Sequence, residues 1–274
     1  MSLEIEVYGR RKGSNPGTTC SFALRGGRRQ DYYLKYCPGS KLPPSSYLTP
    51  PNQPIYESVT SEMANMLGLL TPNASVVEGS DVVFTGQPQH LKKINANMPF
   101  FFVSKLIHHP EQSNGSESLE QRMTIEAPYR DLLMVSDIIG RKQNYAYYEN
   151  QDRLIYLDLG CSFVNATKGF LYMKNHIKRR PNSKKIKKLE KRLKGYYIAP
   201  MAAGINDFIS LQDFVQIPRT LEIPIIDSKT GKRKKTPVSS LLYKEEIDEI
   251  IEILTYELVS DLSKLKKTGI LLKE

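Results

Sequence analysis

An apolar stretch of the sequence ends in an acid followed two residues later by a glycine. Residues 156–160 read Tyr-Leu-Asp-Leu-Gly, and the acid is Asp158. An ionised aspartate at a strand end, close to a flexible glycine, can reach a hard cation such as Mg²⁺. Asn144 lies fourteen residues upstream, across a predicted hairpin, where its amide suits a second metal ligand. A plain Asp-x-Gly turn remains the alternative for Asp158.

A lysine stands inside a predicted strand. In residues 32–36, Tyr-Tyr-Leu-Lys-Tyr, alternation puts Lys35 on the same face as Tyr33. Burying an unpaired ammonium is costly, so a central-strand lysine calls for an acid partner, and Glu57 or Glu62 on the next predicted helix can supply one. Two alternatives stay open: an edge-strand lysine that reaches water, and a glutamate that serves the helix dipole.

A glycine-containing turn lies within the first predicted hairpin. Residues 13–17 read Gly-Ser-Asn-Pro-Gly, so Gly13, Ser14 and Gly17 are candidate phosphate contacts through closely approaching backbone N–H groups. Most glycine-containing turns of this kind reverse the chain and bind no phosphate. With a lysine, its acid partner and metal ligands, however, this turn would complete the parts that phosphoryl transfer from ATP needs.

The elements that must position these residues change character along the chain. Hydrophobic periodicity and turn residues predict strands first and helices later. The predicted strands cover 5–24 (a hairpin), 32–36, 76–84, 99–106, 145–148 and 154–157, and the predicted helices cover 56–70, 132–139, 183–194, 211–215 and 243–267. This order predicts an α+β protein in two lobes, residues 1–110 and 111–274.

In this order, the residues resemble the HipA-type and phosphoinositide-kinase-like branch of the protein kinase superfamily. Lys35 is similar to the family's strand lysine, and residues 56–72 are similar to its glutamate, helix, glycine and proline segment, which makes Glu57 the preferred partner. Residues 157–163, Leu-Asp-Leu-Gly-Cys-Ser-Phe, resemble its Asp-Phe-Gly-x-Ser-Phe metal segment. The resemblance covers residues 7–163. It implies a protein-kinase-like fold with a strand-rich N-lobe, a mainly helical C-lobe, and ATP with Mg²⁺ or Mn²⁺.

The catalytic loop departs from the family pattern. Gly140 is followed by Arg-Lys-Gln-Asn, so the usual aspartate and histidine are missing, while Asn144 matches the metal-binding asparagine. Asp137 is the candidate base, and the alternative for it is a polar residue on a helix face. Three interpretations follow: Asp137 replaces the base, the base is dispensable, or the protein is catalytically inactive.

The function implied by the resemblance is that of an atypical Ser/Thr protein kinase, of bacterial toxin or effector type. The alternatives are a phosphoinositide or inositol-phosphate kinase and a pseudokinase binding module. The acceptor would accordingly be a protein or a phosphorylated lipid or inositol. No apolar run is long enough to span a membrane and no signal peptide is visible, so we expect a bacterial cytosol, or a host cytosol for a secreted effector.

The chain is basic, with a net charge of +10 and a pI near 9.3. Much of this charge lies at 174–194, where apolar residues at helical spacing predict an amphipathic helix with a basic face. The candidate polyanion-binding residues are Lys178, Arg179, Arg180, Lys184, Lys185 and Lys188. A phosphoinositide, an inositol polyphosphate or RNA would fit, although nucleic acid is disfavoured because few aromatics interleave. A solvated helix face is the alternative.

Overall fold

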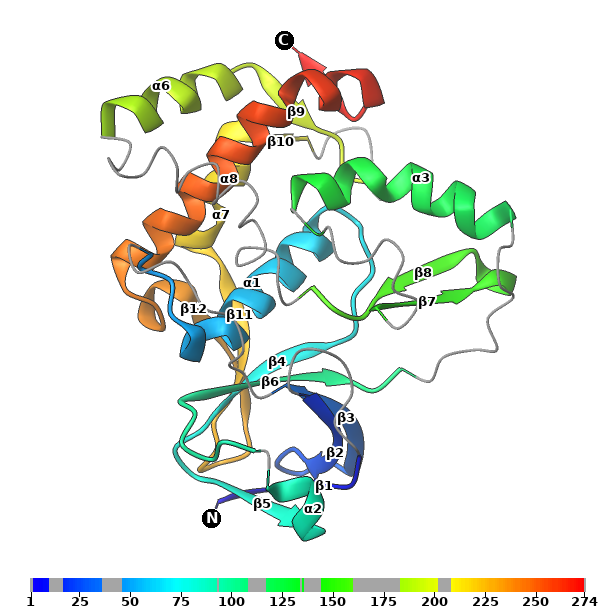
Figure 1. The fold of residues 1–274 in the computed structure, drawn as a ribbon, viewed down its shortest axis with the longest axis vertical. Coiled ribbons are helices and arrows are strands. Elements are labelled where there is room, and N and C mark those ends of the chain that lie inside the picture. The colour runs from blue at the N-terminus through cyan, green and yellow to red at the C-terminus, as the bar shows by residue number, and fades with distance from the viewer. Residues whose placement is uncertain are drawn as a thin grey trace. The chain divides into compact units, whose positions relative to one another are not determined.

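The computed structural model describes residues 2–9, 17–35, 46–92, 94–107, 117–133, 135, 144–159, 183–201 and 208–273. The architecture is α+β, with one large mixed sheet, two small sheets and several helices (Figure 1). The chain forms two compact units. The first unit is Met1–Val59, Pro72–His108 and Leu221–Leu242, and the second is Thr60–Thr71, His109–Thr220 and Tyr243–Glu274.

The first unit is built on an eight-stranded sheet of order β12-β11-β4-β6-β3-β2-β1-β5. The pairs β1–β5 and β4–β11 are parallel and the others are antiparallel. The strands are β1 Leu3–Val7, β2 Gly17–Ala23, β3 Arg29–Lys35, β4 Ala74–Glu78, β5 Val82–Gly86, β6 Phe100–Lys105, β11 Glu222–Ile226 and β12 Arg233–Pro237. A short helix, α2 (Pro88–Leu91), follows β5.

Strict alternation in β1 gives this sheet its apolar face. Leu3, Ile5 and Val7 are buried, whereas the two glutamates between them are exposed. The buried side chains join a core that also contains Phe22 and Val103. Because successive side chains in a strand point to opposite faces, this pattern fixes which face of the sheet is covered.

Helix α1 (Gln53–Met66) follows a 3₁₀ turn at Pro50–Asn52. A proline is tolerated in the first turn of a helix, where its missing N–H would have no intrahelical partner, and Pro54 occupies that turn. The helix ends before Gly68, whose φ of 85° lies in the left-handed region that favours glycine. It therefore begins three residues before the predicted range of 56–70 and ends before Leu70.

The second unit contains four helices in its described part, together with a hairpin and a three-stranded sheet of order β10-β9-β13. The helices are α3 Glu117–Leu132, α6 Ser183–Leu193, α7 Leu211–Thr220 and α8 Lys244–Leu265, and the strands are β7 Tyr145–Tyr148, β8 Arg153–Tyr156, β9 Tyr196–Ile198, β10 Ile209–Ser210 and β13 Leu271–Lys273. Helix α8 packs against α3, α6 and α7 (Figure 1). No helix in the described ranges is both long and apolar enough to cross a membrane.

One segment differs from its sequence-based expectation. Residues 222–237 fall in the stretch expected to be mainly helical, yet they form the β11–β12 hairpin, which pairs with β4 of the first unit's sheet. The helix expected over 132–139 stays a prediction. Helix α3 ends at Leu132, and residues 136–140 lie outside the described part of the chain.

Candidate functional site

A buried ion pair joins a strand and a helix of the first unit. Lys35, at the end of β3, is 7% exposed, and Glu57, on α1, is 3% exposed. The Lys35 Nζ donates a hydrogen bond to Glu57 Oε1, and it lies 5.5 Å from the centroid of the Phe102 ring. Glu57, rather than Glu62, makes this contact. The ammonium and the carboxylate are thereby held together away from water, where their electrostatic attraction is less screened.

The strands beside β3 explain why Lys35 is buried. β3 is a central strand between β2 and β6, and Lys35 stands opposite Gly17 on one side and Phe102 on the other. A Cβ atom on Gly17 would lie only 2.3 Å from the Tyr33 hydroxyl, so a side chain at this position would require the Tyr33 ring to move. Gly13 and Ser14, the other turn candidates, lie outside the described residues.

Asn144 and Asp158 flank the open end of the β7–β8 hairpin in the second unit. Tyr145 pairs with Tyr156, and the backbone N–H of Leu157 donates to the carbonyl of Asn144 over 2.8 Å. Asn144 is buried and Asp158 is half-buried. The hairpin therefore brings these two backbone positions side by side although fourteen residues separate them in sequence. Asp137, the candidate base, lies outside the described residues.

A second contact fixes the same hairpin. The backbone N–H of Tyr156 donates to the carbonyl of Leu70 over 2.9 Å, and Leu70 also forms a parallel bridge with Ile155. Strand β8 is thus held by hydrogen bonds on both sides. Such a strand has little freedom to shift, which suits the precise placement of the residue that follows it.

The side chains at this hairpin end are of the kind that could hold a hard divalent cation. The Asp158 carboxylate and the Asn144 amide provide oxygen ligands of the kind that Mg²⁺ prefers. Within the described ranges, no group of three or more His, Cys, Asp or Glu side chains is arranged to hold a metal. Mg²⁺ is commonly held by one or two carboxylates together with phosphate oxygens and water, so two protein ligands are a workable number.

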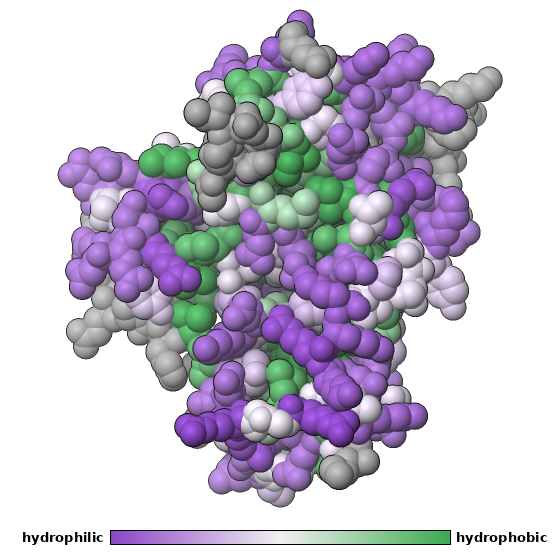
Figure 2. Space-filling model, turned by 180° about the vertical axis from the view of Figure 1, so that it is seen from behind, coloured by the Kyte–Doolittle hydropathy of each residue, from purple (hydrophilic) through white to green (hydrophobic). Residues whose placement is uncertain are grey.

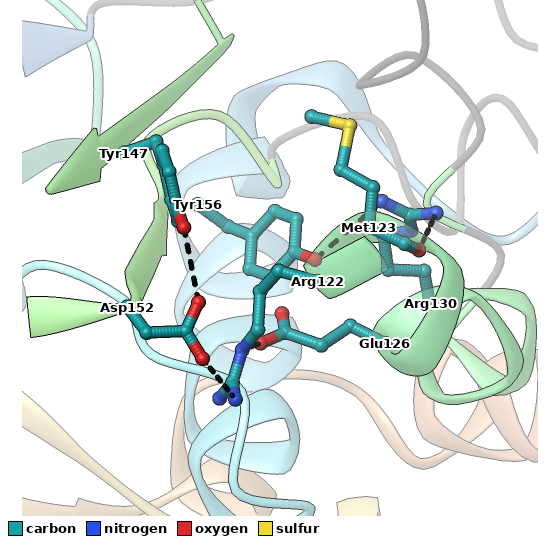
Figure 3. A network of polar contacts seen from close by, with 7 residues as sticks. All are labelled: Arg122, Met123, Glu126, Arg130, Tyr147, Asp152 and Tyr156. Carbon is teal, nitrogen blue, oxygen red and sulfur yellow. Dashed lines mark hydrogen bonds and ion pairs between the residues drawn. The ribbon is translucent and has the colours of Figure 1, made fainter. Parts of the chain in front are cut away.

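A polar network that sequence reasoning missed connects α3 with the hairpin (Figure 3). Arg122, Glu126 and Arg130 lie four residues apart on α3, so they share one face of the helix. Their partners on the hairpin are Asp152 and Tyr156. The regular spacing of opposite charges was the available signal, but their placement opposite the hairpin follows only from the tertiary structure.

Burial sets the protonation behaviour of this network. Glu126 is 1% exposed, and burial raises the pKa of its carboxyl, opposed by the Tyr156 hydroxyl and by Arg122. Burial and the neighbouring Glu126 also raise the pKa of Tyr156, so its hydroxyl remains protonated. Arg130, which lies 3.5 Å from that hydroxyl, keeps a positive charge beside it.

The predicted polyanion-binding residues are only partly within the described chain. Lys178, Arg179 and Arg180 lie outside it, as do the side chains of Lys184 and Lys185 on α6. Lys188 is exposed, and so are the neighbouring basic residues of the same segment, Lys187, Lys191, Arg192 and Lys194. Figure 2 shows hydrophilic side chains gathered over much of the face seen from behind.

Further lysines lie beside the strand that follows α6. The Lys266 ammonium lies 4.6 Å from the centroid of the Tyr196 ring, and Lys273 stands opposite Tyr196 in the β9–β13 register. A hydrogen bond from Lys266 is the main cause that lowers the pKa of the Tyr196 phenol. The local potential is therefore positive, and it favours an anion at this position.

The fold and the two sites define an α+β protein that has a buried Lys–Glu pair in one unit and an Asn–Asp hairpin end in the other. No protein-family model matches the sequence, and no curated protein matches it.

Proposed function

We propose that this protein is an ATP- and Mg²⁺-dependent phosphotransferase with a protein-kinase-like fold, acting as an atypical Ser/Thr protein kinase. The observation that carries the proposal is the buried ion pair of Lys35 and Glu57. Protein kinases hold a lysine of their third strand with a glutamate of the following helix in this way, and the lysine then contacts ATP phosphates. Burying two charges costs free energy of desolvation, which favours a functional role for the pair over a purely structural one.

The order of the elements supports the same conclusion. Lys35 lies on the third strand, Glu57 on the helix that follows it, and Asn144 and Asp158 at the start and end of a later hairpin. In protein kinases, an asparagine of the catalytic loop and the aspartate of the Asp-Phe-Gly segment hold the metal ions. Each of these residue types occurs here in that chain order and on the corresponding kind of element.

Each residue then has a defined task. Lys35 would neutralise charge on the ATP phosphates, while Glu57 fixes the ammonium in its orientation. Asn144 and Asp158 would supply oxygen ligands to Mg²⁺, whose bound charge offsets that of the phosphates. The acceptor oxygen forms a bond to the γ-phosphorus, the bond to the bridging β–γ oxygen breaks, ADP leaves and the acceptor's proton is released. Asp137 is the candidate to receive that proton.

The test is phosphate transfer from γ-labelled ATP by the purified chain, with protein and phosphoinositide acceptors compared in the same assay. Asp158→Ala should abolish labelling, and Asp248→Asn, a half-buried acid of α8 that pairs with Arg219 and Lys244, serves as the control. Undiminished labelling by Asp158→Ala would contradict the assigned role. Labelling of lipid alone would support the lipid-kinase alternative, and ATP binding without transfer would support the pseudokinase.

A polyanionic regulator is a second proposal, favoured by the lysines around Tyr196 and on α6. An inositol polyphosphate carries the phosphate density that such a surface attracts. Calorimetric titration with inositol hexakisphosphate at low salt should give heat that weakens in Lys266→Ala and Lys273→Ala. No heat from the unaltered chain would refute the proposal.

A further inference from the structure

We propose that Arg122 is a positioning residue, which clamps the β7–β8 hairpin to α3 and so sets Asn144 and Asp158 for the divalent cation. The inference rests on the proposed function, because it assumes that those two residues hold a metal. It adds a residue that belongs to none of the motifs carrying the resemblance to kinases and that only the geometry of the second unit reveals.

Arg122 bridges two acids that belong to different elements. Its Nε donates to Glu126 Oε1 over 2.5 Å within α3, and its Nη1 lies 3.6 Å from Asp152 Oδ2 on the hairpin (Figure 3). A lysine carries a single point of charge, whereas the planar guanidinium presents several N–H donors in fixed directions. An arginine can therefore link the helix to the hairpin in a defined geometry.

Asp152 is well placed to receive this contact. It follows the 3₁₀ turn Glu149–Gln151 between the two strands, and its φ of 43° is the one positive value at a non-glycine residue in the described chain. Aspartate and asparagine tolerate this conformation better than most residues. The Tyr147 hydroxyl donates to Asp152 Oδ1 over 3.0 Å, so both carboxylate oxygens are held.

The same helix face holds the other end of β8. Arg130 Nη1 lies 3.5 Å from the Tyr156 hydroxyl, and Arg130 Nη2 donates to the carbonyl of Met123 over 2.9 Å. Tyr156 is 1% exposed and stands two residues before Asp158. Helix α3 therefore contacts the hairpin at its turn through Arg122 and near its open end through Arg130.

These contacts hold the hairpin as a short rigid unit. Its four residue pairs keep a fixed register from Tyr148↔Arg153 to Tyr145↔Tyr156, and a strand rises about 3.3 Å per residue. Without the contact at the turn, the hairpin would pivot about the contacts that hold β8 near its open end, those with Leu70 and Arg130, and this rotation would turn Asn144 and Asp158. A misplacement of about 1 Å at a reactive centre is enough to lower its performance strongly. The effect should therefore be felt at the metal ligands, although Arg122 touches neither of them.

A helix-stabilising role alone does not explain the arrangement. The contact with Glu126 would be sufficient for that role, since an i,i+4 pair stabilises its own helix. The Asp152 carboxylate is 60% exposed, so a pair with it adds little stability. The contact between Arg122 and Asp152 therefore orients the hairpin and adds little to the free energy of folding.

The experiment measures Mn²⁺ binding directly, by the electron paramagnetic resonance signal of the free ion, in the presence of a non-hydrolysable ATP analogue. Arg122→Met keeps the aliphatic stem and removes the charge, and Asp152→Asn keeps the shape and the tolerance of positive φ. Each should raise the half-saturating Mn²⁺ concentration about two- to fivefold, the range of a partly exposed ion pair. The double variant should show no further rise in the half-saturating concentration, because both single changes break the same contact, that of Arg122 with Asp152.

A matched control lies at the other end of α3. Lys264 pairs with Asp131, in the last turn of that helix, so Lys264→Ala should leave the half-saturating Mn²⁺ concentration unchanged. Arg122→Lys should recover part of the loss. Thermal midpoints of Asp152→Asn and Lys264→Ala should fall by similar small amounts, which separates positioning from folding.

The outcomes distinguish this inference from the function on which it rests. If Asp158→Ala abolishes Mn²⁺ binding while Arg122→Met and Asp152→Asn leave it unaltered, the positioning role is overturned and the metal site stands. If Asp158→Ala keeps both Mn²⁺ binding and phosphate transfer, the proposed function fails, and the positioning role is overturned with it.

Discussion

The Lys35 ammonium of β3 and the Glu57 carboxylate of α1 form a hydrogen-bonded ion pair, although 22 residues separate them in sequence. Both side chains are almost fully buried, so neither charge is compensated by bulk water. This relationship provides a direct way to separate what the pair does for folding from what it does for phosphate transfer.

Breaking this pair on one side should destabilise the protein, whereas replacing both partners should not. Glu57→Leu leaves the Lys35 charge buried, which should lower the free energy of unfolding by about 3–5 kcal/mol. The double variant Lys35→Met/Glu57→Leu should recover most of that loss, because no buried charge remains. Urea denaturation followed by circular dichroism measures both. Phosphate transfer should stay absent in the double variant, and activity in it would remove Lys35 from the mechanism.

Removing divalent cations should stop phosphate transfer without unfolding the chain. Chelation should abolish labelling from γ-labelled ATP, and Mg²⁺ or Mn²⁺ should restore it. Asn144→Ala removes one of two proposed protein ligands and should raise the half-saturating metal concentration about tenfold or more. Asn97→Ala, at an exposed turn, is the matched amide control. A metal dependence that Asn144→Ala leaves unchanged would count against its role as a ligand.

The buried carboxyl of Glu126 predicts a specific pH dependence of stability. Burial raises its pKa above the ordinary 4.5, so folding favours the protonated form. Its contribution to stability is present at low pH and is lost as the pH rises through the raised pKa. Glu126→Gln does not ionise, so its free energy of unfolding should rise relative to that of the unaltered protein as the pH increases above about 4.5.

Urea titrations at several pH values test this prediction. Glu117→Gln replaces an exposed acid in the first turn of the same helix and should show no comparable change. If the free energies of unfolding of Glu126→Gln and of the unaltered protein differed by the same amount at every pH, the raised pKa of Glu126 in the folded state would be contradicted.

The β11–β12 hairpin should be integral to the stability of the first unit. Ile225 is fully buried and pairs with Val76 of β4, so Ile225→Ala should lower the free energy of unfolding by about 2–5 kcal/mol through the lost side chain and the cavity left behind. Lys234→Ala, at the neighbouring exposed position of β12, should have an effect within about 0.5 kcal/mol. Equal effects would mean that the hairpin packs loosely.

Several elements could be predicted from local pattern. The basic helix expected over 183–194 is α6, the helix expected over 243–267 is α8, and the small hairpin at 145–157 is β7–β8. The spacing of apolar residues identified these elements, because the buried face of a helix or a strand is formed by residues only a few positions apart in sequence. Residues 222–237 escaped the same reasoning. Their strands are completed by β4, a partner nearly 150 residues away, and no local period reports such a pairing.

The sequence by itself determined the types of the chemical groups and their order: a strand lysine, a helix glutamate, an asparagine before a hairpin and an aspartate after it. Tertiary structure alone decided that Arg122 reaches Asp152 and that Glu126 is buried, and it brings Lys35 to Glu57, the partner that the resemblance implies. Local conformation follows from interactions over a few residues. Distant pairs and burial depend instead on the free energy of packing whole elements together, which no short stretch of sequence contains.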